Sequence, residues 1–267
     1  MSNKKTSGGF PLVVSALAIA ICICIGVFIF KMILGAPSNF EGGDPDKGHP
    51  HNILGTMYKG GFIVPILIGF LLTVLTFAIE RFITIQRASG SGKTDKFIGS
   101  IKELVKNHDL DGAMAACDKQ KGSLANVIHE GIAKYKFVEN DSNMDKESKV
   151  NAISKALEEA TALELPMLTK NMVVISTMAS IGTLAGLIGT VVGMIRAFAA
   201  LANAGAPDTS ALATGISEAL VNTLVGILTS ACAIIFYNLF SNRVDQITHA
   251  MDEAGFSIIQ EFQTSGK

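Results

Sequence analysis

Four long apolar runs restrict what this chain can fold into. A helix that spans a bilayer needs about 20 consecutive, mainly apolar residues. Residues 10–34, 61–82, 172–201 and 211–240 meet that requirement. Only 17% of the 267 residues are charged, against about a quarter in ordinary soluble domains. The sequence therefore predicts an all-α, polytopic membrane protein with four transmembrane helices and a helical domain outside the bilayer.

The first run follows Lys4 and Lys5, as the apolar core of a secretory signal peptide would. It is longer than the roughly 7–15 apolar residues of such a core, and no A-x-A cleavage site follows it. We therefore expect residues 10–34 to form a retained transmembrane anchor.

The distribution of Lys and Arg predicts the orientation, since cytoplasmic loops carry the excess of positive charge. Residues 83–170 hold thirteen of these side chains, and Arg81 stands at the edge of that loop. The segment 35–60 holds only two, Lys47 and Lys59, against three acids, and the link 202–210 holds none. Both termini and the large loop are therefore expected in the cytoplasm.

This topology divides the chain into six predicted parts. They are a cytoplasmic leader with an extra transmembrane helix (1–36), a periplasmic linker (37–60), a second transmembrane helix (61–82), a cytoplasmic helical domain (83–170), two pore-lining transmembrane helices (171–240) and a cytoplasmic C-terminal helix (241–267).

Apolar residues at helical spacing continue outside the bilayer. Helices are predicted over 94–108, 110–119, 123–137 and 147–170, the last with its apolar face on Val150, Ile153, Leu157 and Ala160 and a kink at Pro166. The tail 244–262 repeats the pattern with Ile247, Met251, Phe256 and Ile259.

Several chemistries find no support in the sequence. The stretch R-A-S-G-S-G-K-T at 87–94 resembles a phosphate-binding loop, but Arg87 stands where that motif needs glycine and no strand precedes it. His49 and His51 have no matching further ligands for a metal. No Ser/His/Asp set can be assembled, and no basic, aromatic-interleaved patch indicates nucleic acid. We expect no enzymatic activity, no cofactor and no metal site.

Small residues follow one face of the third span and one face of the fourth. Such faces let membrane helices approach closely. The small residues of the third span are Gly182, Gly186, Gly189, Gly193 and Ala197, and Gly226 lies in the fourth span with Ala219 and Ser230. Hydroxyls run beside the glycines of the third span, among them Thr183 and Thr190. Helix packing is the simplest interpretation of these faces.

Glu218 favours a further role, because an acid inside a transmembrane helix is costly and usually faces a partner or an aqueous path. Asn222 lies one turn further along the same face. The line they form is predicted to be the wall of a hydrated pathway. Arg196 is expected at a similar depth in the antiparallel third span, where it either pairs with Glu218 or extends to the outer interface.

At these residues the sequence resembles the MotA/TolQ/ExbB family of ion-driven motor subunits. The motifs are G-L-I-G-T-V-V-G-M at 186–194 and S-E-A-L-V-N-T-L-V-G at 217–226. The resemblance extends over about residues 61–240 and is closest to subunits of the ExbB and TolQ type. The extra first span departs from the three-span pattern of those subunits.

The resemblance implies a pentameric ring around the single transmembrane helices of an ExbD/TolR-like partner dimer. An aspartate of the partner would take up and release the ion. Thr190 and Thr223 match the two pore threonines facing that aspartate, and Glu218 matches the family glutamate. Asn222, Thr183 and Arg196 are candidate supports of the pore or ring interface. A TonB-like protein is a further possible partner.

The implied function is conversion of the proton motive force into mechanical work, for outer-membrane import or envelope maintenance. Two alternatives stay open from the sequence, namely a flagellar or gliding stator and a passive oligomeric membrane scaffold. Threonine hydroxyls suit sodium as well as protons, so the sequence does not choose the ion.

Overall fold

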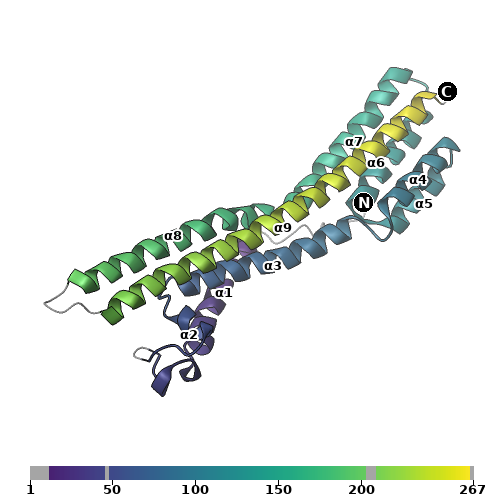
Figure 1. Cartoon of the computed structure of the whole chain (residues 1–267). Coiled ribbons are helices and arrows are strands. Elements are labelled where there is room, and N and C mark those ends of the chain that lie inside the picture. The colour runs from purple at the N-terminus through teal and green to yellow at the C-terminus, as the bar shows by residue number, and fades with distance from the viewer. Residues whose placement is uncertain (1–11, 46–47, 203–208, 265–267) are drawn as a thin grey trace. The chain divides into compact units, whose positions relative to one another are not determined.

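The computed structural model describes residues 12–45, 48–202 and 209–264, and these are almost entirely helical (Figure 1). Within these ranges there is no strand, only an isolated bridge between Phe40 and Pro50. In chain order the elements are α1 (Leu12–Ile29), the π-helix η1 (Phe30–Leu34), the 3-10 turns η2 (Pro37–Asn39) and η3 (Glu41–Gly43), α2 (Ile53–Tyr58), α3 (Val64–Ala88), α4 (Thr94–Lys106), α5 (Leu110–Gln120), α6 (Gly122–Glu139), α7 (Lys146–Thr169), α8 (Met172–Ala202) and α9 (Thr209–Thr264).

The predicted all-α class with four candidate spans is confirmed. The stretches long and apolar enough to cross a membrane are Val13–Leu34, Val64–Ala88 and parts of Lys146–Ala202 and Thr209–Thr264. Part of the charge pattern used for orientation, including Lys4, Lys5, Lys47 and most of the link 202–210, lies outside the described residues.

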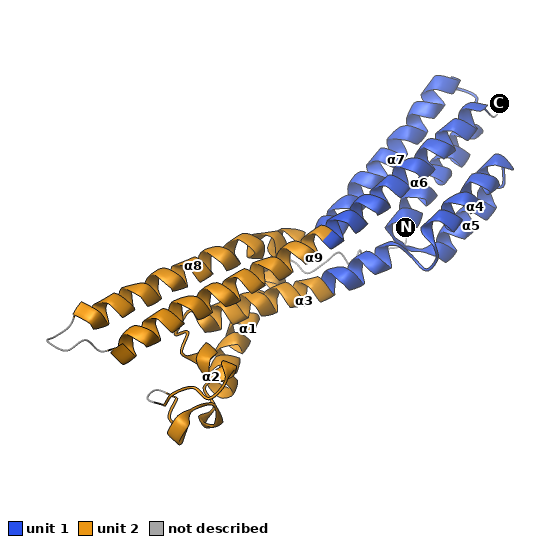
Figure 2. Ribbon diagram, viewed as in Figure 1, with its two compact units in different colours: residues 1–8, 80–170, 239–267 blue, residues 9–79, 171–238 orange. Residues whose placement is uncertain are grey.

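The chain forms two compact units, shown in different colours in Figure 2. Unit 1 contains Glu80–Lys170 and the chain from Leu239 onward, and unit 2 contains Gly9–Ile79 and Asn171–Asn238.

In unit 2, α1 crosses α3 at a pair of glycines. A Cβ added to Gly26 would lie 2.5 Å from the Pro65 carbonyl oxygen, and one added to Gly69 would lie 2.7 Å from the Ile23 Cα. The two backbones are therefore in direct contact, which only glycine permits at these positions. The extra first helix is thus fixed to the second span by a small-residue crossing.

The segment predicted as a periplasmic linker is folded rather than extended. Buried Asn39 donates from Nδ2 to the carbonyls of Ile33 and Leu34, at 2.8 and 2.9 Å, and accepts a hydrogen bond from Asn52. The Tyr58 ring stacks on Phe30, with 4.6 Å between centroids. These contacts attach the segment to the end of η1, because the asparagine satisfies carbonyls that a helix end leaves unpaired.

Unit 1 is built from the end of α3, α4 to α7 and the end of α9. Helix bounds agree with those predicted to within a few residues, and Ile153, Leu157 and Ala160 are buried as the spacing predicts. Pro166 lies inside α7, which continues past that proline to Thr169, and the kink expected there stays a prediction.

Helix α9 is one helix of 56 residues that continues from the fourth span into the tail, through the predicted division at residue 240. Near residue 240 the sequence changes from apolar to charged residues, but it contains no residue there that would end a helix. Phe256, expected on the buried face, is 68% exposed, and Ile258 and Phe262 are buried instead.

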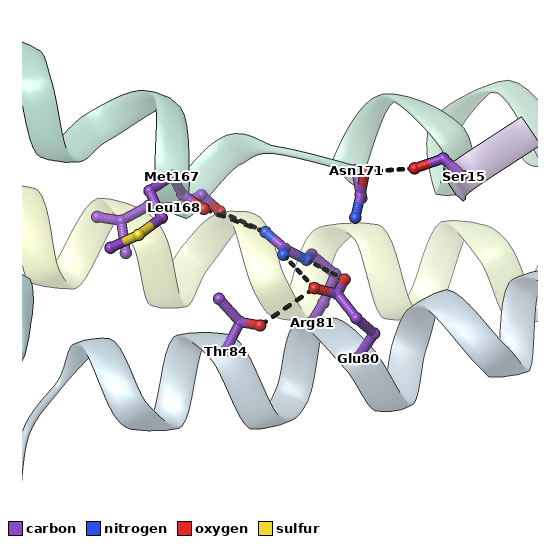
Figure 3. A network of polar contacts seen from close by, with 7 residues as sticks. All are labelled: Ser15, Glu80, Arg81, Thr84, Met167, Leu168 and Asn171. Carbon is purple, nitrogen blue, oxygen red and sulfur yellow. Dashed lines mark hydrogen bonds and ion pairs between the residues drawn. The ribbon is translucent and has the colours of Figure 1, made fainter. Parts of the chain in front are cut away.

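Arg81 lies within unit 1 and is fully buried rather than standing at a surface (Figure 3). It pairs with Glu80 at 2.5 Å and donates from Nη1 to the carbonyls of Met167 and Leu168, at 3.3 and 3.4 Å. Those carbonyls belong to the last turn of α7, where no intrahelical donor remains. Arg81 therefore caps α7, and a cation is favourable at a helix C-terminus.

Cys117 on α5 predicts a pH dependence of the stability of unit 1. Burial, assisted by the neighbouring Asp118 charge, raises the pKa of its thiol from 9.0 to about 12. The unfolded chain therefore loses this proton above pH 9 while the folded chain keeps it, so stability falls as pH rises from 9 towards 12. Relative to Cys117→Ala, the unfolding free energy of the natural chain should drop by about 2 kcal/mol between pH 8 and 10.5. Urea unfolding followed by hydrogen exchange in α5 measures the unfolding free energy of both proteins at each pH. If the difference between the two proteins is the same at pH 8 and at pH 10.5, the prediction is contradicted.

Candidate functional site

Helices α8 and α9 lie side by side in unit 2 because glycines of each meet the backbone of the other (Figure 1). A Cβ on Gly226 would lie 2.7 Å from the Gly182 carbonyl oxygen and 2.8 Å from the Gly186 Cα. A Cβ on Gly193 would lie 2.7 Å from the Ala219 nitrogen. The small face therefore joins two helices of the same chain. Polar side chains of both helices meet along this contact between α8 and α9, which we call the seam.

This contact predicts that Gly226→Ala destabilises unit 2 by about 1–3 kcal/mol, the usual effect of overpacking. The added methyl meets main-chain atoms, which cannot rotate away. Gly99→Ala is the matched control, because no atom lies within 4 Å of its added Cβ and alanine favours an exposed helix. Denaturant titration of the protein in bicelles measures both, and equal effects would contradict the prediction.

Thr190 on α8 and Thr223 on α9 face each other across the seam. Their hydroxyls are hydrogen-bonded, and each also lies within reach of a main-chain carbonyl, Gly186 at 3.2 Å for Thr190 and Ala219 at 3.2 Å for Thr223. Both side chains are half-buried. The result is an uncharged pair of oxygens, held in place and partly accessible, in the middle of two apolar helices.

Thr183 lies two turns away along α8 and donates to the Ser230 hydroxyl at 2.7 Å. It is exposed within the single chain, while Ser230 is buried. The hydroxyls of the seam thus form two cross-helix pairs. Both members of the Thr190–Thr223 pair are half-buried, whereas the Thr183–Ser230 pair joins an exposed side chain to a buried one.

Glu218 and Arg196 form an ion pair, so the first of the two alternatives left open by the sequence is the one observed. Arg196 Nη1 donates to Glu218 Oε1 at 2.6 Å, with side-chain exposures of 50% and 6%. The guanidinium also lies 5.4 Å from the ring centroid of Phe62. The acid is enclosed and its partner reaches outward, so the arginine supplies the only charge that stabilises the carboxylate among the residues described here.

The glutamate is enclosed by a turn that the sequence did not indicate. Gly61 has φ +78°, and a Cβ there would lie 2.2 Å from Glu218 Oε1. One residue earlier, the Gly60 carbonyl accepts a hydrogen bond from Asn222 Nδ2 at 2.9 Å. Asn222 is fully buried and its Oδ1 has no partner. Two consecutive glycines before an apolar run are the only sequence signal for this contact.

Glu218 and Asn222 lie between α8 and the Gly60–Gly61 turn, because Glu218 pairs with Arg196 and Asn222 packs against Gly189. Thr223 instead bonds Thr190 at the half-buried seam. A pathway wall for the Asn222 line stays a prediction. Chemically, the seam offers neutral oxygen ligands and one buried, paired carboxylate. No group of three or more His, Cys, Asp or Glu that could hold a metal occurs in the described part of the chain.

Comparison with known proteins places these residues in a family context. A family model described as the MotA/TolQ/ExbB proton channel family matches residues 120–253, half of the chain. That stretch includes the threonine pair, the ion pair and every glycine of the α8–α9 contact.

Individual relatives agree with this match. The chain is 38% identical to an ExbB-like 3 protein of Synechocystis sp. over 32% of its own length and 41% of the relative's. It is 26% identical to the biopolymer transport protein ExbB of Pseudomonas putida, over 76% of this chain and 61% of that one. It is 28% identical to the Tol-Pal system protein TolQ of Haemophilus influenzae, over 76% and 86%. It thus spans less than two thirds of the first two relatives.

Proposed function

Because the chain belongs to the MotA/TolQ/ExbB proton channel family, we propose that it is the multispan subunit of a proton-driven motor of the ExbB/TolQ type. Relatives named ExbB and TolQ favour this type over a flagellar stator. The observation that carries the proposal is the Thr190–Thr223 pair. These two hydroxyls are hydrogen-bonded and half-accessible at the contact between two apolar helices. A passive scaffold has no need of such a pair.

In this proposal the threonine pair faces a titrating carboxylate supplied by an ExbD/TolR-like partner dimer. Residues 172–201 and 211–240 hold one acid, Glu218, and it is already paired with Arg196. The group that takes up and releases the proton is therefore assigned to the partner. Each elementary charge that crosses about 100 mV supplies about 2.3 kcal/mol, which is available for moving the partner helices.

The same proposal includes the assembly and its placement. Five copies form a ring in the inner membrane, with both termini and residues 83–170 in the cytoplasm and 37–60 in the periplasm. The work serves outer-membrane import or envelope maintenance, through a TonB-like protein in the first case.

Native mass spectrometry of the tagged full chain, extracted in mild detergent with what co-purifies from its own cell, tests this function. We expect five copies with two copies of a small single-span protein that carries a membrane aspartate. A homo-oligomer without any such protein, under conditions where the oligomer itself survives, would favour the scaffold.

A further inference from the structure

Unit 1 contains a cavity of about 490 Å³ that the motor function does not use. Its volume falls within the range of small-molecule sites. The residues that line it are Ile83, Gln86, Arg87, Gly90, Ser91 and Lys121. They come from the last turns of α3, the loop that follows, and the single residue between α5 and α6.

The loop of this cavity is held in place by hydrogen bonds and by a close backbone contact. Ser91 donates its backbone N–H to the Gln120 carbonyl at 2.8 Å, and Gln120 Nε2 donates to the Ser89 carbonyl at 3.2 Å. Gly90 has φ +82°, and a Cβ there would lie 2.4 Å from the Lys121 carbonyl oxygen. The cavity is therefore a built feature of unit 1.

Lys121 occupies a conformation that its residue type disfavours. Its φ of 59° and ψ of 177° lie at the edge of a region used almost only by glycine. The next residue is a glycine, Gly122, but the strained conformation falls on the lysine before it. Strain of this kind is concentrated at functional sites, which points to a use for the lysine side chain at this cavity.

The charge of the cavity is positive and uncompensated. Arg87 and Lys121 form no ion pair in the described part of the chain, and no acid is among the lining residues. Arginine and lysine beside a serine hydroxyl and a glutamine amide form the set of donors that phosphate groups accept from.

The position along α3 relates the cavity to the membrane surface. About 20 residues cross the hydrocarbon layer, so a span that starts at Val64 reaches Ile83, and Arg87 follows about one turn later. Ile83 is 44% exposed and supplies an apolar wall at this depth. We propose that the cavity binds a phosphate group, that of an anionic phospholipid headgroup, between Arg87 and Lys121.

Native mass spectrometry of the full chain, with phosphatidylglycerol or phosphatidylcholine added to the detergent, tests this site. The natural chain should retain one phosphatidylglycerol per subunit in clear preference to phosphatidylcholine. Lys121→Gly removes the cation and also relieves the backbone strain, so retention should fall roughly tenfold while the unfolding temperature stays equal or rises. Arg87→Gln should lower retention similarly.

The control removes two exposed cations elsewhere in unit 1, Lys106→Gln and Lys155→Gln, and should leave retention unchanged. An equal loss of phosphatidylglycerol in the control would overturn the site, because general charge attraction would then explain the binding. Full retention in Lys121→Gly would also overturn the site, because the lysine would then not be needed. A separate titration with glycerol 3-phosphate distinguishes the source. If that compound binds with the same dependence on Lys121 and no lipid is preferred, the lipid assignment is wrong and the ligand is a soluble phosphate.

Discussion

Thr190→Ala and Thr223→Ala are each expected to lower proton flux through the partner-bound complex by roughly 10- to 100-fold. A hydrogen bond to a charged group contributes about 1.5–3 kcal/mol, and each 1.4 kcal/mol is a factor of about ten. The two hydroxyls are bonded to each other, so loss of either leaves the other held only by main-chain carbonyls. Flux into proteoliposomes that contain a pH-sensitive dye measures the effect.

Two exposed threonines of the same helices provide matched controls. Thr177 on α8 and Thr214 on α9 bond only their own helix, to the carbonyls of Val173 and Ser210. Their alanine variants should conduct normally, and Thr190→Ser should recover much of the lost flux because it keeps the hydroxyl. Normal conduction by Thr190→Ala in an intact complex would sink the proposed role of the pair.

The contact between α8 and α9 was predictable because its cause is local in sequence. Steps of three and four between glycines place them on one helix face, and only a close neighbour explains a face without side chains. Gly182, Gly186 and Gly193 all meet α9 in the structure. The partner of that face was not predictable. The sequence is equally compatible with a contact between subunits, whereas the structure makes it within one chain.

The surroundings of Glu218 were predictable only in part. An acid in an apolar helix requires a partner, and antiparallel spans put Arg196 at its depth, but the sequence could not choose between pairing and extension to the interface. The Gly60–Gly61 turn was missed because it lies more than 150 residues earlier in the chain, and its contribution is a backbone carbonyl and the absence of a side chain. Neither leaves a pattern along α9.

The ends of helices depend on other residues than their faces do. Pro166 lies inside α7, where the lost hydrogen bond does not end the helix, and α7 ends near Asn171, which has φ 61°. The predicted division near residue 240 rests on a change of polarity, and α9 continues through it as one helix. Polarity decides what surrounds a helix, while glycine, proline and caps decide where it ends.

The Glu218–Arg196 pair predicts an asymmetric response to removal of its two members. Arg196→Met should destabilise unit 2 by about 3 kcal/mol, the lower end of the range for a buried pair, because it leaves a carboxylate enclosed without its partner. Glu218→Gln should cost about 1 kcal/mol or less, because the side chain of Arg196 is half-exposed and can stay solvated.

The double variant Glu218→Gln, Arg196→Met separates pairing from packing. If Arg196→Met lowers the stability because it leaves an unpaired acid, neutralising that acid should restore most of the lost stability. The double variant, which lacks both charges, should then be more stable than Arg196→Met alone. Denaturant titration of all four proteins in bicelles yields the coupling free energy of the pair. Additive effects would show that Arg196 stabilises the fold through its contact with Phe62 instead. Strong coupling would mean that the two side chains stabilise unit 2 as a pair, and Arg196 would then belong to any account of the proposed ion pathway.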